Sequence, residues 1–173
     1  MTTIFGCDQR ISKSSAIAEA LGALDEINSF LGLCKVHKES ASLKLSAVSF
    51  SEIIQDVQQN LFIIQAEIAG SKKTIEKNKI KEIEKIIDEI EKTLPLIKTF
   101  FISGGTELSA LFDVARTIAR RAERRAVEVS EEGKQKISEN SLAYLNRLSS
   151  LLYALARLTN HKSDITEQIP DYH

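Results

Sequence analysis

The 173-residue chain has the length of a single domain, with 43% hydrophobic residues, 27% charged residues and a formal net charge of −1. A charge this close to neutral excludes a protein that coats nucleic acid by bulk electrostatic attraction. No stretch approaches the ~20 consecutive apolar residues of a membrane-spanning helix, and we expect no secretion signal. The two cysteines and three histidines lack the spacing of a zinc site, so we expect a cytoplasmic protein without a protein-held metal.

The order of elements follows from where hydrophobic residues recur every three or four positions. Residues 1–13 are a short polar lead-in, expected to be extended or looped, and residues 161–173 are an irregular tail. The helical periodicity between them predicts five helices, over residues 14–37, 48–69, 74–93, 107–129 and 138–160. Residues 38–46 are a polar linker, and residues 95–105 form the longest internal loop. We therefore predict one all-α domain over residues 1–173, a five-helix antiparallel bundle of the ferritin-like up-and-down type.

The fourth predicted helix concentrates positive charge. Five of the eight arginines fall within ten residues, at Arg116, Arg120, Arg121, Arg124 and Arg125. Arg116, Arg120 and Arg124 lie four residues apart on one face, where like charges repel unless anions lie among them. The arginines either form ion pairs with a neighbouring helix or subunit, to which Asp113 and Glu123 contribute, or clamp a polyphosphate. The use of arginine favours the clamp, because its guanidinium binds phosphate oxygens in pairs.

Three further places break the apolar pattern, and each has two interpretations. Asp25 and Asn28 flank the apolar stripe of the first helix near Gly22, as a packing contact or as part of a site. The segment 100–105, FFISGG, leads into the arginine helix, where its glycines either expose amides to an anion or only make a turn. Asn146 lies beside the leucine face of the last helix, where it bonds either an adenine or ribose edge or a neighbouring helix.

Together these segments resemble the trimeric class of ATP:cob(I)alamin adenosyltransferases, over about residues 2–160. The most specific part is RTIARRAER followed by YLNRLS. The matching segments are EALGALDEINSFLG (19–32), QDVQQNLFIIQAEIA (55–69), FFISGGTELSALFDVARTIARRAERR (100–125) and YLNRLSSLLYALAR (144–157). The resemblance implies a homotrimer with active sites between subunits. It also implies transfer of the 5′-deoxyadenosyl group from ATP to cob(I)alamin, with Mg²⁺ on the triphosphate that is released.

The resemblance implies roles for individual residues. Asp25 and Arg116 would pair across the subunit interface and act in catalysis with Arg120 and Arg124. Phe100 matches the aromatic residue beside the corrin, so Phe100 and Asp25 form the cobalamin side. The residues implied at ATP are Thr2, Thr3, Lys13, Arg120, Arg121, Glu123, Arg124 and Asn146. The chain departs from the family pattern at Ile17, Ser103 and Ser150, where Arg, Pro and Asp are usual, and the usual Gly-rich stretch before the position of Thr2 is absent.

The chemistry of such a transfer sets what the protein must do. Cobalt(I) is itself the nucleophile, so the protein needs no catalytic base, but it must orient ATP, neutralise the departing triphosphate and exclude water. Two other functions remain open: a non-catalytic bundle that binds or senses ATP or cobalamin, and a structural bundle whose arginines form interface ion pairs. A cobalamin reductase or an adenosylcobalamin-dependent enzyme is a further expected partner, whereas nucleic acid and membrane are not.

Overall fold

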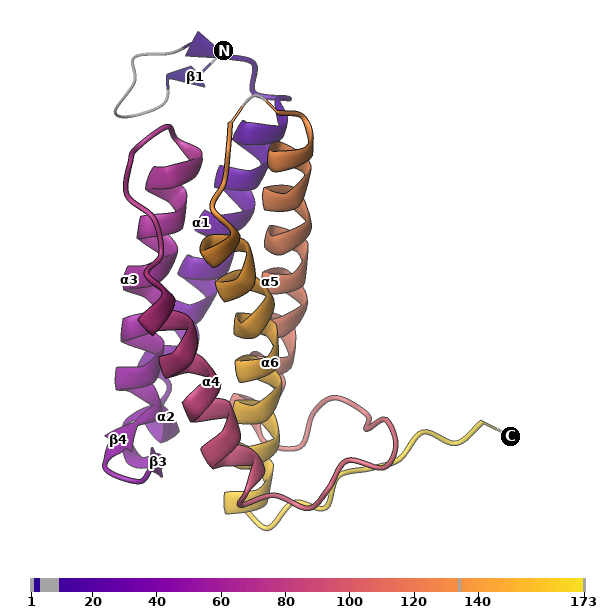
Figure 1. The fold of residues 1–173 in the computed structure, drawn as a ribbon. Helices are drawn as coiled ribbons and strands as arrows, with labels where there is room; N and C mark the ends of the chain where they lie inside the picture. Colours follow the sequence, from indigo (N-terminus) through magenta and orange to yellow (C-terminus); the bar gives the residue numbers. More distant parts are fainter. Residues whose placement is uncertain (1, 4–9, 134, 173) are drawn as a thin grey trace.

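The computed structural model describes residues 2–3, 10–133 and 135–172. Within these residues, five long helices run alternately up and down one bundle (Figure 1). They are α1 (Ala16–Val36), α3 (Phe50–Ile68), α4 (Lys77–Glu91), α5 (Glu107–Glu131) and α6 (Glu139–Lys162). The predicted all-α, five-helix antiparallel fold is confirmed, although α5 and α6 each end two residues later than expected.

Side-chain caps set where most of the long helices begin. Four of the five long helices start after a hydroxyl residue whose oxygen accepts a hydrogen bond from a backbone N–H three residues later, which satisfies one of the free amides of the first turn. These residues are Ser15, Ser49, Thr106 and Ser138. Just beyond α3, Gly70 has a φ of +94°, a conformation that costs glycine little and ends the helix.

The segment 38–46 is more ordered than the polar linker that we predicted. It contains the short helix α2 (Lys38–Ser42) and most of a hairpin between β3 (Lys44–Leu45) and β4 (Val48–Ser49). Short polar side chains stabilise it by bonding to nearby backbone: Ser40 Oγ donates to the carbonyl of Cys34 at 2.5 Å, and His37 Nδ1 accepts from the amide of Glu39. The prediction failed because such local bonds leave no hydrophobic periodicity in the sequence.

The lead-in and the tail lie at opposite ends of the bundle (Figure 1). In the lead-in, β1 (Thr2–Thr3) pairs antiparallel with β2 (Arg10–Ile11), which agrees with an extended segment. Cys7 and its neighbours lie outside the described residues. The tail after α6 has no regular secondary structure in its described part, as predicted.

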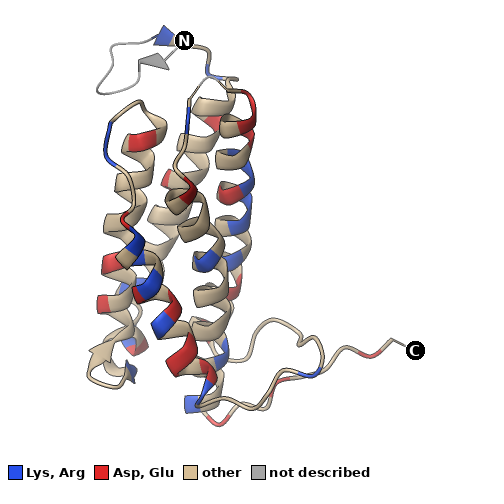
Figure 2. Cartoon of the chain, in the orientation of Figure 1, with Lys and Arg blue, Asp and Glu red and all other residues tan. Residues whose placement is uncertain are grey.

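The core forms where the predicted apolar stripes meet. Helix α1 packs against α3 and α5, and α6 packs against α5 and α4. The charged helix α4 buries only its narrow seam of Ile83, Ile87 and Ile90 and turns its alternating charges outward (Figure 2). Searching the described residues reveals no helix with the length and apolar character needed to cross a membrane.

Candidate active site

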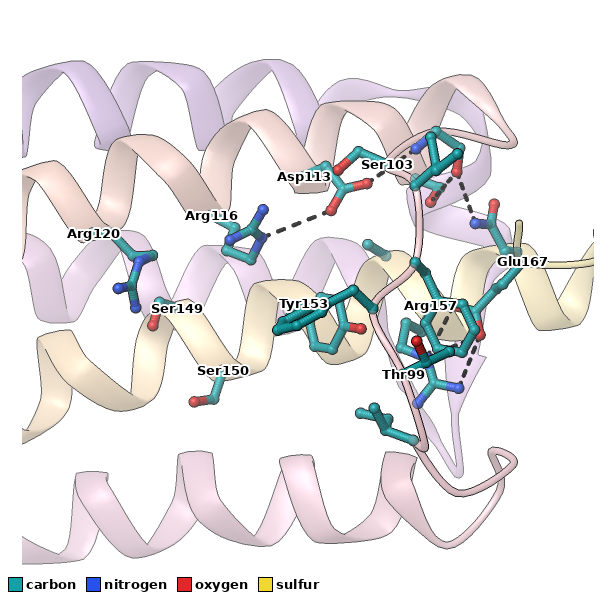
Figure 3. A pocket seen from close by; sticks show the side chains of 18 of the residues that line it. Thr99, Ser103, Asp113, Arg116, Arg120, Ser149, Ser150, Tyr153, Arg157 and Glu167 are labelled. Carbon is teal, nitrogen blue, oxygen red and sulfur yellow. Dashed lines mark hydrogen bonds and ion pairs between the residues drawn. The ribbon is translucent and has the colours of Figure 1, made fainter. Parts of the chain in front are cut away.

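Two hollows lie end to end along the groove between α5 and α6. The larger, of about 650 Å³, is bounded by the loop before α5, by α6 and by the tail (Figure 3). The smaller, of about 280 Å³, follows the second half of α5 and is lined by Arg120, Glu123, Arg124, Val127, Glu128, Glu131 and Asn146. Arg120 lines both hollows. The groove therefore has two halves: one is lined by Arg120 and Arg124, and the other is bounded by the loop that carries Phe100 and Phe101.

Ion pairs account for three of the five clustered arginines. Arg121 pairs with Glu26 of α1, Arg125 lies 2.8 Å from Glu128, and Arg116 Nε lies 3.8 Å from Asp113 Oδ1. Glu128 also raises the pKa of Arg125 by its hydrogen bond and its charge. Among the described residues, Arg120 and Arg124 form no ion pair, and both are exposed in the groove. The ion-pair interpretation therefore leaves these two guanidinium groups available to an anion.

Asn146 and Glu123 meet across the same groove. Asn146 Nδ2 donates to Glu123 Oε1 at 2.8 Å, and Asn146 Oδ1 accepts from Arg147 at 2.6 Å. The Asn146 amide thus bonds a neighbouring helix, as one of the two interpretations of this residue predicted. Both residues are also at the wall of the smaller hollow, so the structure brings these two predicted site residues together.

The glycine pair before α5 makes a turn that is fixed from two sides. The amide of Gly104 donates to Asp113 Oδ2 at 3.2 Å, so it already faces an anion of the same chain. Asn160 of α6 donates from Nδ2 to the carbonyl of Gly104 at 2.8 Å and accepts from the amide of Thr106 at 3.1 Å. Of the two interpretations of the glycines, the turn is therefore the one that these contacts support. Asp113 also links the turn to Arg116 (Figure 3).

Alanine at Gly105 is expected to destabilise the fold more than alanine at Gly104. Both glycines have a positive φ, of +107° and +125°, which strains any residue with a Cβ by about 1–3 kcal/mol. At Gly105 the added Cβ would also lie 2.3 Å from Asn160 Oδ1, whereas nothing lies within 4 Å at Gly104. Displacing Asn160 should cost a further ~1–2 kcal/mol in lost hydrogen bonds. Urea unfolding measures both variants, and equal stability would show that Asn160 does not hold the turn.

The two phenylalanines of the loop differ in their surroundings. Phe100 lines the larger hollow with 79% of its surface exposed, whereas Phe101 is half-buried with its ring centre 5.1 Å from the guanidinium carbon of Arg157. Opposite the loop, the ring of Tyr153 lies 6.0 Å from the guanidinium carbon of Arg116. Burial raises the pKa of the Tyr153 hydroxyl. The hollow therefore combines aromatic surface with an arginine at its edge.

Several predicted site residues do not reach the groove within this chain. Asp25 is exposed on α1 and has no ion pair among the described residues, while its predicted partner Arg116 pairs with Asp113 instead. Gly22 is exposed, and no heavy atom of the described residues beyond its own helix turn would lie within 4 Å of a Cβ there, so none of their backbone approaches it closely. Lys13 is exposed between β2 and α1. The segment that leads into α1 lies at the end of the bundle where α5 ends (Figure 1). Thr2 and Thr3 lie in β1 at the same end, but their side chains are outside what the structure describes.

Several residues that line the larger hollow were not predicted as site residues, and Tyr153, Arg157, Asn160 and Glu167 are four of them. Arg157 and Asn160 interrupt the leucine stripe of α6 and are nevertheless buried, which is the signal that could have revealed them. Of the three departures from the family pattern, Ser103 and Ser150 line this hollow (Figure 3), and Ile17 packs against the core.

Comparison with known proteins gives one consistent family. A family model described as cobalamin adenosyltransferase matches residues 1–159. A corrinoid adenosyltransferase of Bacillus subtilis is 34% identical over 90% of this chain and 80% of its own length. The fold matches a variant of the PduO-type ATP:corrinoid adenosyltransferase of Lactobacillus reuteri, complexed with cobalamin and ATP, with a TM-score of 0.85 and 30% identity over 98% of this chain and 93% of that one.

Some relatives are much longer than this chain. The corrinoid adenosyltransferase PduO of Citrobacter freundii is 34% identical over 92% of this chain, but the match spans only 47% of that relative. The match to PduO of Salmonella typhimurium spans 50% of it. The chain thus spans about half the length of these two relatives.

Proposed function

The chain belongs to the cobalamin adenosyltransferase family, and we propose that it transfers the 5′-deoxyadenosyl group of ATP to cob(I)alamin and releases triphosphate. The observation that carries this proposal is the groove in which Arg120 lines both hollows. A triphosphate in the smaller hollow and a corrin in the larger one would place the reacting centres of the two substrates near the residue that both hollows share. Appearance of a cobalt–carbon bond from ATP and reduced cobalamin is the test.

The arginine-rich half of the groove suits a nucleotide. Arg120 and Arg124 offer guanidinium forks to the phosphates, which is the strongest geometry for such anions. Glu123 and Asn146, already joined at 2.8 Å, present a carboxylate and an amide for the adenosine part. The ATP site would be completed, once the lead-in or a neighbouring subunit moves closer, by Arg121, Lys13, Thr2 and Thr3. The roles of these four residues are supported only by the match of motifs.

Mg²⁺ fits the donors of this half. Magnesium takes oxygen ligands, one or two carboxylates together with phosphates and water. Glu131 lines the smaller hollow and provides such a carboxylate next to the arginines. A bound ion would neutralise part of the triphosphate charge, and the two arginines would neutralise much of the rest.

The transfer itself is a displacement at carbon. The electron pair of cobalt(I) forms the bond to the ribose 5′ carbon, and the bond from that carbon to the phosphate oxygen breaks, with its electrons leaving on the triphosphate. No proton is abstracted, so the protein needs no general base. What Arg120 and Arg124 provide is stabilisation of the departing charge, in a place where water competes less than in bulk solvent.

Phe100 and Asp25 form the cobalamin side of the proposed site. Phe100 is exposed at the larger hollow, where its apolar ring is free to pack against a large ligand. Asp25 would come from a neighbouring subunit and reach Arg116. Arg116 Nε supports this, because it is buried at 3.8 Å from Asp113 and has no hydrogen-bond partner among the described residues.

The proposed assembly is a homotrimer, and its mass is a direct test. Light scattering should give about three times the 19.3 kDa of one chain, because the family resemblance places Asp25 against Arg116 of a neighbouring subunit. Asp25→Ala should weaken the assembly and lower activity together. A 19.3 kDa species with full activity would contradict the trimer and the shared site. Within this proposal, the enzyme works in the cytoplasm with a cobalamin reductase or an adenosylcobalamin-dependent enzyme as its partner.

A further inference from the structure

Arg157 is a charged side chain almost wholly enclosed by the protein. Only 4% of the residue is exposed, although it lies on α6 among leucines. It faces Glu167 of the tail with two parallel contacts, Nε to Oε1 at 2.9 Å and Nη2 to Oε2 at 2.9 Å (Figure 3). A buried charge is costly unless its partner and hydrogen bonds are nearly ideal, and this two-pronged pairing meets that condition.

The same guanidinium also contacts the loop that carries Phe100. Its Nη2 donates to the carbonyl of Pro95 at 3.1 Å, and its carbon lies 5.1 Å from the ring centre of Phe101. Beside these contacts the amide of Ile102 donates to the carbonyl of Gln168 in the tail at 2.8 Å. Helix α6, the loop and the tail therefore meet around one side chain.

These contacts complete a frame around Phe100. The far end of the loop is fixed at Gly104 by Asn160 and Asp113, and the near end is fixed at Pro95 by Arg157. Phe100 lies between the two anchors with most of its surface exposed. A loop that is held at both ends can keep an exposed ring at one height above the hollow, whereas a loop held at one end would let it swing.

We propose that Arg157 and Glu167 are positioning residues for the corrinoid half of the site, which hold the Phe100 loop and the tail together so that the ring stands at the correct distance from the lower face of the corrin. This inference rests on the function proposed above. The two residues touch neither substrate in this proposal and act through Phe100. Breaking the pair should therefore impair use of cobalamin without impairing use of ATP, whose groove lies beyond Arg120.

The variant that tests this proposal is Glu167→Gln, because it removes the charge but keeps the size of a tail side chain outside the core. Arg157→Lys is the second variant, because lysine keeps the charge but loses the fork. Glu89→Gln is the matched control, since it makes the same change at a carboxylate that pairs with Lys85 on α4. The readouts are hydrogen exchange of loop 96–102 without substrates, KM for cobalamin and for ATP, and the absorption of bound cob(II)alamin.

We expect Glu167→Gln to speed exchange of the Ile102 amide and to raise KM for cobalamin by roughly threefold to tenfold, with KM for ATP changed by less than about twofold. Compared with the wild-type protein, the absorption spectrum should show a larger fraction of bound cob(II)alamin that keeps the nitrogenous base on the lower face of cobalt. The variant that combines Glu167→Gln with Arg157→Lys should raise KM for cobalamin no more than the worse of the two single variants, because both substitutions break the same ion pair. Both KM values rising together, or all readouts matching Glu89→Gln, would overturn the proposal. A wild-type protein that forms no product would overturn the proposed function and the corrinoid role with it, while unchanged hydrogen exchange would separately refute the link between loop and tail.

Discussion

Arg120→Ala is expected to lower the rate of adenosyl transfer by about tenfold to a hundredfold while leaving the helix content unchanged. Arg120 is exposed, lines both hollows and forms no ion pair or hydrogen bond through its side chain within the described residues, so its removal breaks no polar contact among them. Each charge-assisted hydrogen bond to the triphosphate contributes on the order of 1.5–3 kcal/mol, which sets the size of the loss. Alanine is a good helix former, so α5 should remain intact.

A matched arginine separates this effect from a general loss of positive charge. Arg125 lies five residues further along α5, lines neither hollow and pairs with Glu128 at 2.8 Å. Turnover at saturating cobalamin and circular dichroism should therefore show a large loss for Arg120→Ala, a similar loss for Arg124→Ala and little change for Arg125→Ala. A normal rate for Arg120→Ala would reject the phosphate clamp.

Phe100→Ala is expected to slow the reduction of bound cob(II)alamin far more than it weakens ATP binding, on the order of tenfold to a hundredfold in the coupled assay. Free cobalamin carries a nitrogenous base on the lower face of cobalt, and the extra electron of Co(I) enters an orbital that points at this ligand. An apolar ring against the lower face would displace the base and exclude water. Because 79% of Phe100 is exposed in the ligand-free chain, the variant should fold normally.

Two assays of the same variants distinguish the roles of the neighbouring side chains. Turnover is measured once with pre-reduced Co(I) and once with Co(II) and a reductant. Leu96→Ala is the control, because Leu96 is 85% exposed on the same loop but does not line the hollow. If Phe100→Ala turned over normally in both assays and Phe101→Ala lost turnover in the Co(II) assay, then Phe101, and not Phe100, would be the residue at the corrin. Phe101→Ala should lower stability by less than the ~3–5 kcal/mol of a fully buried phenylalanine, because Phe101 is only half-buried.

The fold could be predicted from the sequence wherever burial follows a repeat. The five long helices have stripes of Ile, Leu and Ala that recur at helical spacing, and these stripes are the core that the structure shows. Helix α2 and the β3–β4 hairpin could not be predicted in the same way. They depend on single hydrogen bonds such as the one from Ser40 to the carbonyl of Cys34, and such bonds do not follow from the hydrophobic pattern of the sequence.

The candidate site was predictable where residues share one helix or a specific motif. The arginines of α5 stand out by their spacing, and Asn146 by its place beside leucines. The structure brings Arg120, Arg124 and Asn146 to one hollow, whereas Arg121 and Arg125 form ion pairs instead. Arg157 and Glu167 meet through a tail without periodicity, and Arg157 bonds a backbone carbonyl, so neither contact leaves a pattern. For Asp25 the family resemblance implies a partner, Arg116, from a neighbouring copy of the chain, and within one chain Arg116 lies 3.8 Å from Asp113 instead.

The measurement that bears most directly on the central claim is the formation of adenosylcobalamin by the purified chain. ATP and chemically reduced cob(I)alamin are supplied anaerobically, the cobalt–carbon product is followed by its absorption spectrum, and the phosphate product is identified. We predict adenosylcobalamin and intact triphosphate in equal amounts, with the rate lost in Arg120→Ala. Binding of both ATP and cobalamin without any product would instead identify a sensing bundle. Absence of ATP binding in a thermal-shift titration would leave the arginines of α5 with a purely structural role and contradict the proposed function.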